Sequence, residues 1–213
     1  MRQALIVAGG WAGHEPAQGA RVIEAILEEH GFSVRTENST AAYADPALNE
    51  MSLVVPIYTM AKIAKEELNG LTEAVRSGVG LAGYHGGMCD AFREATEYQF
   101  MCGGQWVAHP GNVIDYRVDV VKPADPIMEG IESFPYRSEQ YYMHVDPSNE
   151  VLATTTFSGE HAFWIEGVVM PVVWKRYYGL GRVFYSSLGH VAKEFDIPAM
   201  KTILTRGLLW AAR

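Results

Sequence analysis

The segment Val79-Gly80-Leu81-Ala82-Gly83-Tyr84-His85-Gly86-Gly87 indicates the architecture of this chain more directly than any other part. Its apolar run ends at Tyr84 and is followed by a glycine-flanked histidine, which is typical of a buried strand that turns tightly into a helix. In a turn of the form Gly-x-nucleophile-x-Gly, one side chain stands on a strained bend. Here that side chain is His85, which predicts an acid, a base or a metal ligand in place of a serine or cysteine nucleophile. The alternative is a glycine-rich turn whose histidine has no chemical role.

Strands and helices alternate before this segment. Helical spacing of apolar residues predicts two helices, and short apolar runs predict three strands. The strands are expected at residues 5–8, 32–35 and 53–57, and the helices contain Val22, Ile23, Ile26 and Leu27 and then Leu68, Leu71 and Val75. This order predicts a parallel sheet with right-handed crossovers and helices on both faces.

The second half of the chain has a different pattern, with more strands and fewer helices. We expect strands at residues 113–121 and 151–157, a hairpin made by 172–175 and 182–185, a loop over 123–137, and a last helix that opens near Asp196 and Pro198. No repeat, low-complexity segment or linker interrupts the sequence, so we expect a single domain over residues 1–213.

Composition excludes several classes of protein. The net charge of −8 and the lack of dense Lys/Arg runs argue against nucleic acid and against an anionic membrane surface. The amino-terminal residues lack the pattern of a signal peptide, and Cys89 and Cys102 are too few for a disulfide framework. We therefore expect a cytoplasmic protein with reduced thiols and a small-molecule partner, and a homo-oligomer only as a general tendency of soluble proteins.

Three histidines follow predicted strands closely: His14, His85 and His190. Ligands of open parallel sheets bind beyond the carboxyl ends of the strands, so the three imidazoles are expected at one edge. No His-Glu-x-x-His or Cys-x-x-Cys motif is present, and a metal site would have to be assembled by the fold. The candidate ligands for a divalent metal such as zinc are His14, His85, His109 and His190.

The run Glu139-Gln140-Tyr141-Tyr142 combines a carboxylate, an amide and aromatic rings, as sites that bind sugars do. Its alternative interpretation is an edge strand or loop packed on the core.

Several segments resemble the trehalose-utilisation (ThuA-like) family: Gly83–Gly87, Trp106–Gly111, Pro171–Lys175 and Gly179–His190. That family resembles the class I glutamine amidotransferase-like superfamily. The resemblance implies a flavodoxin-like parallel-sheet sandwich with helices on both faces and added β-hairpins. Amidotransferases carry a cysteine where this chain has His85, which argues against glutaminase activity.

The resemblance implies a role in the catabolism of trehalose-type or 3-keto sugars. We expect an enzyme, a hydrolase, lyase or isomerase, in which a histidine or carboxylate removes a proton next to a ketone. The predicted catalytic residues are His85, Glu139 and His190; the predicted substrate-binding residues are Trp11, His14, Tyr84, His109, Gln140, Tyr141 and Lys175. A non-catalytic sugar-binding or regulatory module and a metal-dependent hydrolase are the alternatives.

Overall fold

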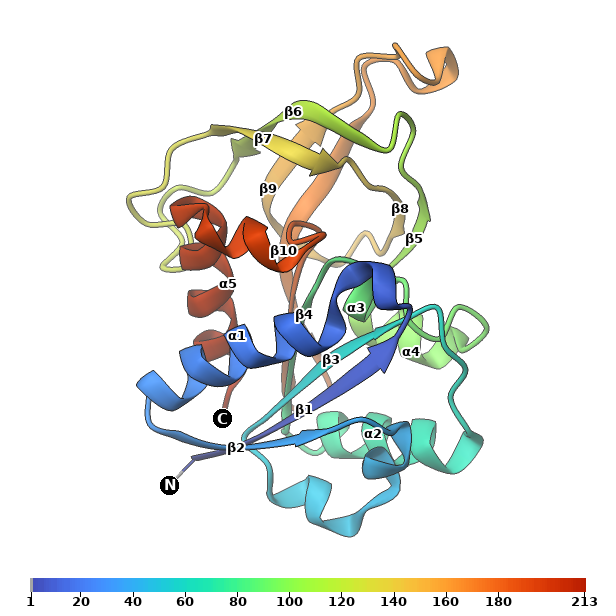
Figure 1. Ribbon diagram of the computed structural model, residues 1–213, viewed down its shortest axis with the longest axis vertical. Coiled ribbons are helices and arrows are strands. Elements are labelled where there is room, and N and C mark those ends of the chain that lie inside the picture. Colours follow the sequence, from blue (N-terminus) through green and yellow to red (C-terminus); the bar gives the residue numbers. More distant parts are fainter. Residues whose placement is uncertain (1) are drawn as a thin grey trace.

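The computed structural model describes residues 2–213 and contains one nine-stranded sheet and one two-stranded sheet (Figure 1). The strands are β1 (Arg2–Gly10), β2 (Phe32–Glu37), β3 (Leu53–Thr59), β4 (Gly80–Tyr84), β5 (Gly104–Ala108), β6 (Val113–Val120), β7 (Phe134–Glu139), β8 (Tyr142–Val145), β9 (Glu150–Thr156), β10 (Val169–Tyr178) and β11 (Gly181–Ser186). The α-helices are α1 (Pro16–Glu29), α2 (Lys65–Arg76), α3 (His85–Cys89), α4 (Thr96–Cys102) and α5 (Pro198–Ala211). Short 3-10 helices are η1 (Ala12–His14), η2 (Thr40–Ala44), η3 (Pro46–Glu50), η4 (Phe163–Ile165) and η5 (Ala192–Asp196).

One half of the large sheet is parallel, as the sequence predicts. The strand order is β2-β1-β3-β4-β11-β10-β9-β6-β7, and each neighbouring pair from β2 to β11 runs parallel. In β1 the register sets Ile6 opposite Val55 of β3. Strands buried on both faces have continuous apolar runs, which explains why β1, β3 and β4 were visible in the sequence.

Helices cover both faces of this parallel half. Ala4 and Ile6 of β1 face the core that contains α1 and α5, and Leu5 and Val7 face the core that contains α2 and α4. A fully buried Leu or Ile side chain stabilises the fold by roughly 1.5–3 kcal/mol. The two cores therefore fix the sheet between its helical layers, and the α/β fold class is confirmed.

The other half is antiparallel. β10 and β11 form the predicted hairpin around Gly179 and Leu180, and β10 is longer than expected because it also pairs with β9. β6 pairs with β9, and β7 forms the edge. In Figure 1, β6 and β7 lie on the side of the molecule toward which the parallel strands point.

The expected loop over residues 123–137 is wrong at its end, because β7 begins at Phe134. Tyr136 and Ser138 are buried while Pro135 and Arg137 are exposed, which is the alternation of a strand with one wet face. Pro135 disguised this pattern, and an edge strand tolerates proline because one side of its backbone has no partner.

Two further features bear on the sequence analysis. Cys89 and Cys102 are buried free thiols in the described chain. Among residues 2–213, no helix has the length and apolar character needed to cross a membrane.

Candidate functional site

Turns at the carboxyl ends of three parallel strands supply three histidines to one place. His14 ends η1 directly after β1, His85 follows β4, and His190 lies shortly after β11. Parallel neighbours end at the same edge of a sheet, so these residues meet although they are far apart in the sequence. The predicted convergence of the three imidazoles is therefore present in the structure.

His85 occupies a strained bend. Its φ is +46°, a left-handed conformation that is uncommon for residues other than glycine. Glu15 and Met60 also have positive φ, at +48° and +58°, and each adjoins a residue of the same site, His14 or Thr59. Such strain persists where the surrounding structure enforces it, and it concentrates at functional sites.

Glycine at position 86 allows the close approach of two site residues. A Cβ atom at Gly86 would lie 2.5 Å from His14 Cε1, closer than real contacts allow. The His14 ring thus packs directly on the turn that carries His85, and the two ring centroids are 4.7 Å apart.

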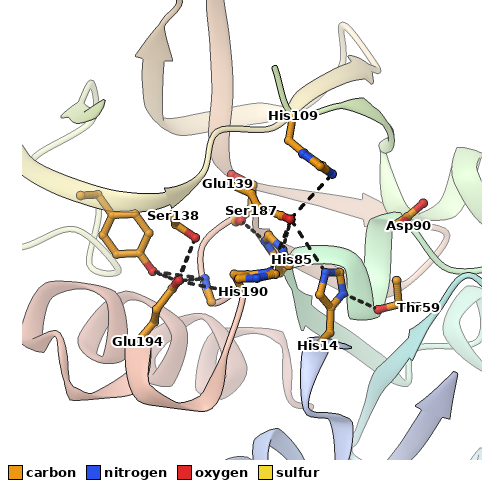
Figure 2. Close-up of polar contacts among 12 residues, drawn as sticks. His14, Thr59, His85, Asp90, His109, Ser138, Glu139, Ser187, His190 and Glu194 are labelled. Atoms are coloured by element: carbon orange, nitrogen blue, oxygen red, sulfur yellow. Dashed lines mark hydrogen bonds and ion pairs between the residues drawn. The ribbon is translucent and has the colours of Figure 1, made fainter. Parts of the chain in front are cut away.

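Four imidazoles surround the carboxylate of Glu139, the last residue of β7 (Figure 2). Glu139 Oε2 is 3.1 Å from His85 Nε2, 3.4 Å from His190 Nδ1 and 3.8 Å from His14 Nε2. Glu139 Oε1 is 3.7 Å from His109 Nε2. We refer to these five residues as the His–Glu cluster.

Two of the imidazoles are anchored on their outer side. His85 Nδ1 is 2.8 Å from the carbonyl oxygen of Ser187, so it must be the protonated nitrogen that donates this hydrogen bond. His14 Nδ1 is 2.9 Å from Thr59 Oγ1. The Tyr141 ring stacks on His85 with centroids 4.1 Å apart. These contacts fix the directions in which His85 Nε2 and His14 Nε2 point.

Burial and mutual interaction shift the acidities in the cluster. Burial lowers the pKa of His85 to about 4, although Glu139 opposes the shift. Burial also lowers the pKa of His190. Burial raises the pKa of Glu139, but the adjacent His14 and His85 outweigh this effect and bring it below its ordinary value. The cluster therefore holds a carboxylate beside two imidazoles, those of His85 and His190, whose burial disfavours protonation.

A second, buried carboxylate supports the loop that carries His190. Glu194 Oε2 accepts hydrogen bonds from the backbone nitrogens of Gly189 and His190, at 3.2 and 3.0 Å, and from the Tyr136 hydroxyl at 2.5 Å. Ser138 Oγ donates to the same carboxylate. Through Glu194, η5 and β7 together hold the backbone at His190.

Comparison with known proteins shows the family to which this chain belongs. The model of the ThuA family, described as trehalose utilisation, matches residues 3–211. The chain belongs to the ThuA family. Among curated protein sequences, none matches this chain.

Solved structures share the ThuA fold over the whole chain. ThuA-like proteins from Bacteroides uniformis and Parabacteroides merdae are 18% and 20% identical to it, each with a TM-score of 0.81. The matches cover 99% of this chain and 91% and 89% of those chains. A β-galactosidase from Bacillus circulans is 14% identical with a TM-score of 0.58, and the match covers 99% of this chain and 30% of that chain. At such identities the likeness establishes the fold and not the activity.

Two further residues nominated from the sequence border the cluster in this ThuA-family chain. Trp11 meets the His14 ring edge-on at 4.7 Å and is 47% exposed, so one indole face remains open to a ligand. Tyr141 lies between His85 and His109 but is buried.

Three nominated residues are not brought to the cluster. Lys175 Nζ is paired with Asp125 and Glu150 and lies over the Trp210 ring. The Tyr84 ring is buried in the core that contains α1 and α5, edge-on to Phe195. Gln140 donates to Thr155 Oγ1 and lines a separate cavity of about 390 Å³ beside β6 and Arg137. In each case a neighbour in the fold holds the side chain elsewhere, which corrects the expectation that these residues face one ligand.

Sequence reasoning missed the outer partners of the cluster. Thr59 and Glu194 are ordinary in the sequence, and only their contacts identify them. The position of Thr59 at the end of β3 was the available signal, because β3 lies between β1 and β4, whose ends carry His14 and His85.

The cluster combines the groups needed for two kinds of chemistry. Neutral imidazoles beside a carboxylate can accept and donate protons. One donor atom from each of His14, His85, Glu139 and His190 lies within 4.8 Å of all the others, and this set of nitrogen and oxygen donors suits a divalent transition metal.

Proposed function

We propose that this ThuA-family protein is an enzyme that acts on a trehalose-type or 3-keto sugar, with the His–Glu cluster as its active site. The observation that carries the proposal is the convergence of four imidazoles on one carboxylate at the carboxyl ends of the parallel strands. A cytoplasmic location and a small-molecule sugar as the partner belong to the same proposal.

The chemistry follows from the acidity of a carbon next to a ketone. In an elimination from a 3-keto glycoside, one imidazole takes the proton from the carbon between the ketone and the glycosidic carbon. The electron pair left behind forms a double bond to the glycosidic carbon, and the glycosidic oxygen leaves with a proton from a second donor. If a proton instead returns to the opposite face of the deprotonated carbon before the glycosidic oxygen leaves, the product is an isomer of the keto sugar.

Exposure divides the roles within the cluster. The side chains of His109 and His190 are 29% and 16% exposed, whereas that of His85 is 1% exposed. We assign the contacts with substrate to His109 and His190. His85 then acts as a positioning residue, because its bond from Nδ1 to Ser187 directs Nε2 at Glu139.

Trp11 supplies an aromatic surface for a sugar ring. It is 47% exposed, and its ring meets His14 edge-on. Aromatic faces pack well against the apolar faces of sugars while the hydroxyl groups bond to polar neighbours.

The test follows proton exchange and product formation. The purified protein is incubated in D₂O with trehalose and with 3-ketotrehalose, and deuterium at the carbon next to the ketone is followed by NMR. We expect exchange or product from the keto sugar, and a loss of at least about 100-fold in H190A, in line with the usual contribution of a general acid or base. The matched control is H144A, because His144 is an exposed histidine of β8 outside the cluster.

Two results would reject the proposal. Binding of either sugar without exchange or product would identify a binding module instead. Full turnover by a folded H190A variant would show that the His–Glu cluster does not carry the reaction.

A further inference from the structure

The geometry points to a divalent transition-metal site in which His14 Nε2, His85 Nε2, His190 Nδ1 and Glu139 Oε2 are the ligands. The three nitrogens lie 3.1 to 3.8 Å from the carboxylate oxygen. A tetrahedral ion with bonds of about 2.1 Å separates its ligands by about 3.4 Å. The four ligand atoms lie within 4.8 Å of one another, and some pairs are further apart than the tetrahedral separation. Binding of the ion would therefore draw the imidazole rings closer together.

His85 directs one ring nitrogen at the carboxylate. His85 Nδ1 donates a hydrogen bond to the carbonyl of Ser187, which leaves Nε2 to face Glu139 Oε2 at 3.1 Å. An imidazole nitrogen that faces a carboxylate in this way supplies, with the carboxylate oxygen, two ligand atoms for a metal ion.

The outer contacts have the form expected of metal ligands. Metal-binding histidines commonly donate their second ring nitrogen to a carbonyl or another acceptor, which fixes the ring and its tautomer. His85 does this with Ser187, and His14 Nδ1 lies at bonding distance from Thr59 Oγ1.

His190 provides an independent sign. Its Nδ1 is buried and makes no hydrogen bond within the described chain, although it points at Glu139 from 3.4 Å. Buried polar atoms without partners are uncommon because each costs about 1–3 kcal/mol. A ligand bond to a metal would satisfy this nitrogen.

The donor set narrows the choice of ion. Three imidazoles and one carboxylate suit zinc, cobalt, nickel, iron or manganese, whereas calcium and magnesium prefer oxygen ligands throughout. His109 lies outside the set, 3.7 Å from Glu139 Oε1 and partly exposed, and marks the side from which a further ligand can approach. An ion bound here would polarise a keto or hydroxyl oxygen of a sugar; that use of the site rests on the proposed function.

The experiment measures metal binding without any reaction. The full chain is freed of metal with a chelator, and ZnCl₂ is titrated in by calorimetry; CoCl₂ gives a visible spectrum that reports the ligand geometry. We expect one ion per chain and little binding of Mg²⁺. E139Q and H190A should weaken Zn²⁺ binding by at least about 100-fold, since each removes a ligand. H144A should bind Zn²⁺ like the parent, since His144 is an exposed residue of β8 outside the cluster.

Circular dichroism checks that each variant is folded. Zn²⁺ affinity that is the same in the parent, E139Q and H190A, or no stoichiometric binding by the parent, would overturn the inference. Stoichiometric binding that depends on Glu139 and His190, in a chain that turns over neither sugar, would keep this inference and reject the proposed function.

Discussion

Gly86 is the position where an added methyl group would disturb the His–Glu cluster most directly. A Cβ added there would lie 2.5 Å from His14 Cε1, so the G86A variant must move the His14 ring. The backbone itself can accept alanine, because Gly86 lies in α3 with an ordinary φ, and alanine favours helices over glycine by about 1 kcal/mol. We expect G86A to fold and to lose about tenfold or more in Zn²⁺ affinity, measured by calorimetry, in line with other changes beside metal ligands.

A double-mutant cycle separates this effect from a general disturbance. In an H14A background the ring is gone, so the added methyl group has only the tight contact with Thr59 Cγ2, at 3.1 Å, left to accommodate. G86A should then cost little further affinity, and an equal loss in both backgrounds would contradict the role given to His14.

At the residue scale, the sequence predicted which histidines meet but not every partner. His14, His85 and His190 were predictable because each follows a parallel strand, and strand ends are visible as the ends of apolar runs. Lys175 was not, because its direction depends on Asp125, a residue 50 positions away in a loop. A motif gives the presence of a side chain, whereas its neighbours decide where it points.

The short element η5 controls the loop of His190 through Glu194. Its carboxylate accepts from two backbone nitrogens and from Tyr136. In E194Q, an amide nitrogen replaces one acceptor and meets groups that also donate. We expect the free energy of unfolding to fall by about 1–3 kcal/mol, measured by urea denaturation. Zn²⁺ affinity should fall as well, because the His190 backbone loses its support.

Y136F is the matched control, since it removes one donor and leaves the carboxylate in place. Its effect on Zn²⁺ affinity should be the smaller of the two. An E194Q variant that binds Zn²⁺ like the parent would show that the loop holds His190 without Glu194.

At the element scale, how well a strand could be predicted from the sequence depended on how much of it is buried. β1, β3 and β4 are buried on both faces and were evident as apolar runs, and the β10–β11 hairpin was marked by Gly179 and Gly181. β7 is an edge strand with Pro135 in it, and its single buried face gives only a weak alternation.

At the scale of the molecule, the cluster links segments from the whole length of the chain. His14, His85, Glu139 and His190 come from both halves of the sheet, so an ion held by all four stabilises the folded state and not the unfolded one. With Zn²⁺ at about 100 times its dissociation constant, this stabilisation is about 2.7 kcal/mol. For a chain of this size, each kcal/mol raises the melting temperature by about 2–4 °C.

We therefore expect Zn²⁺ to raise the melting temperature of the metal-free protein by about 5–10 °C, measured by calorimetry. A chelator should reverse the shift. E139Q should show little of it and H144A all of it; an equal shift in E139Q would mean that Zn²⁺ binds elsewhere.

The position of Glu139 on β7 also governs the order of events when the chain folds. β7 is the outermost strand on the side away from β2, and Glu139 is 54 residues from His85 in the sequence. Contacts between such distant positions form slowly, because a long loop must close before they gain anything. His190 is still further from His85 in the sequence and follows β11, so the last imidazole and the carboxylate both reach the site only when the antiparallel strands are in place. A newly made chain thus acquires its complete set of donor groups as one of the last steps of its maturation.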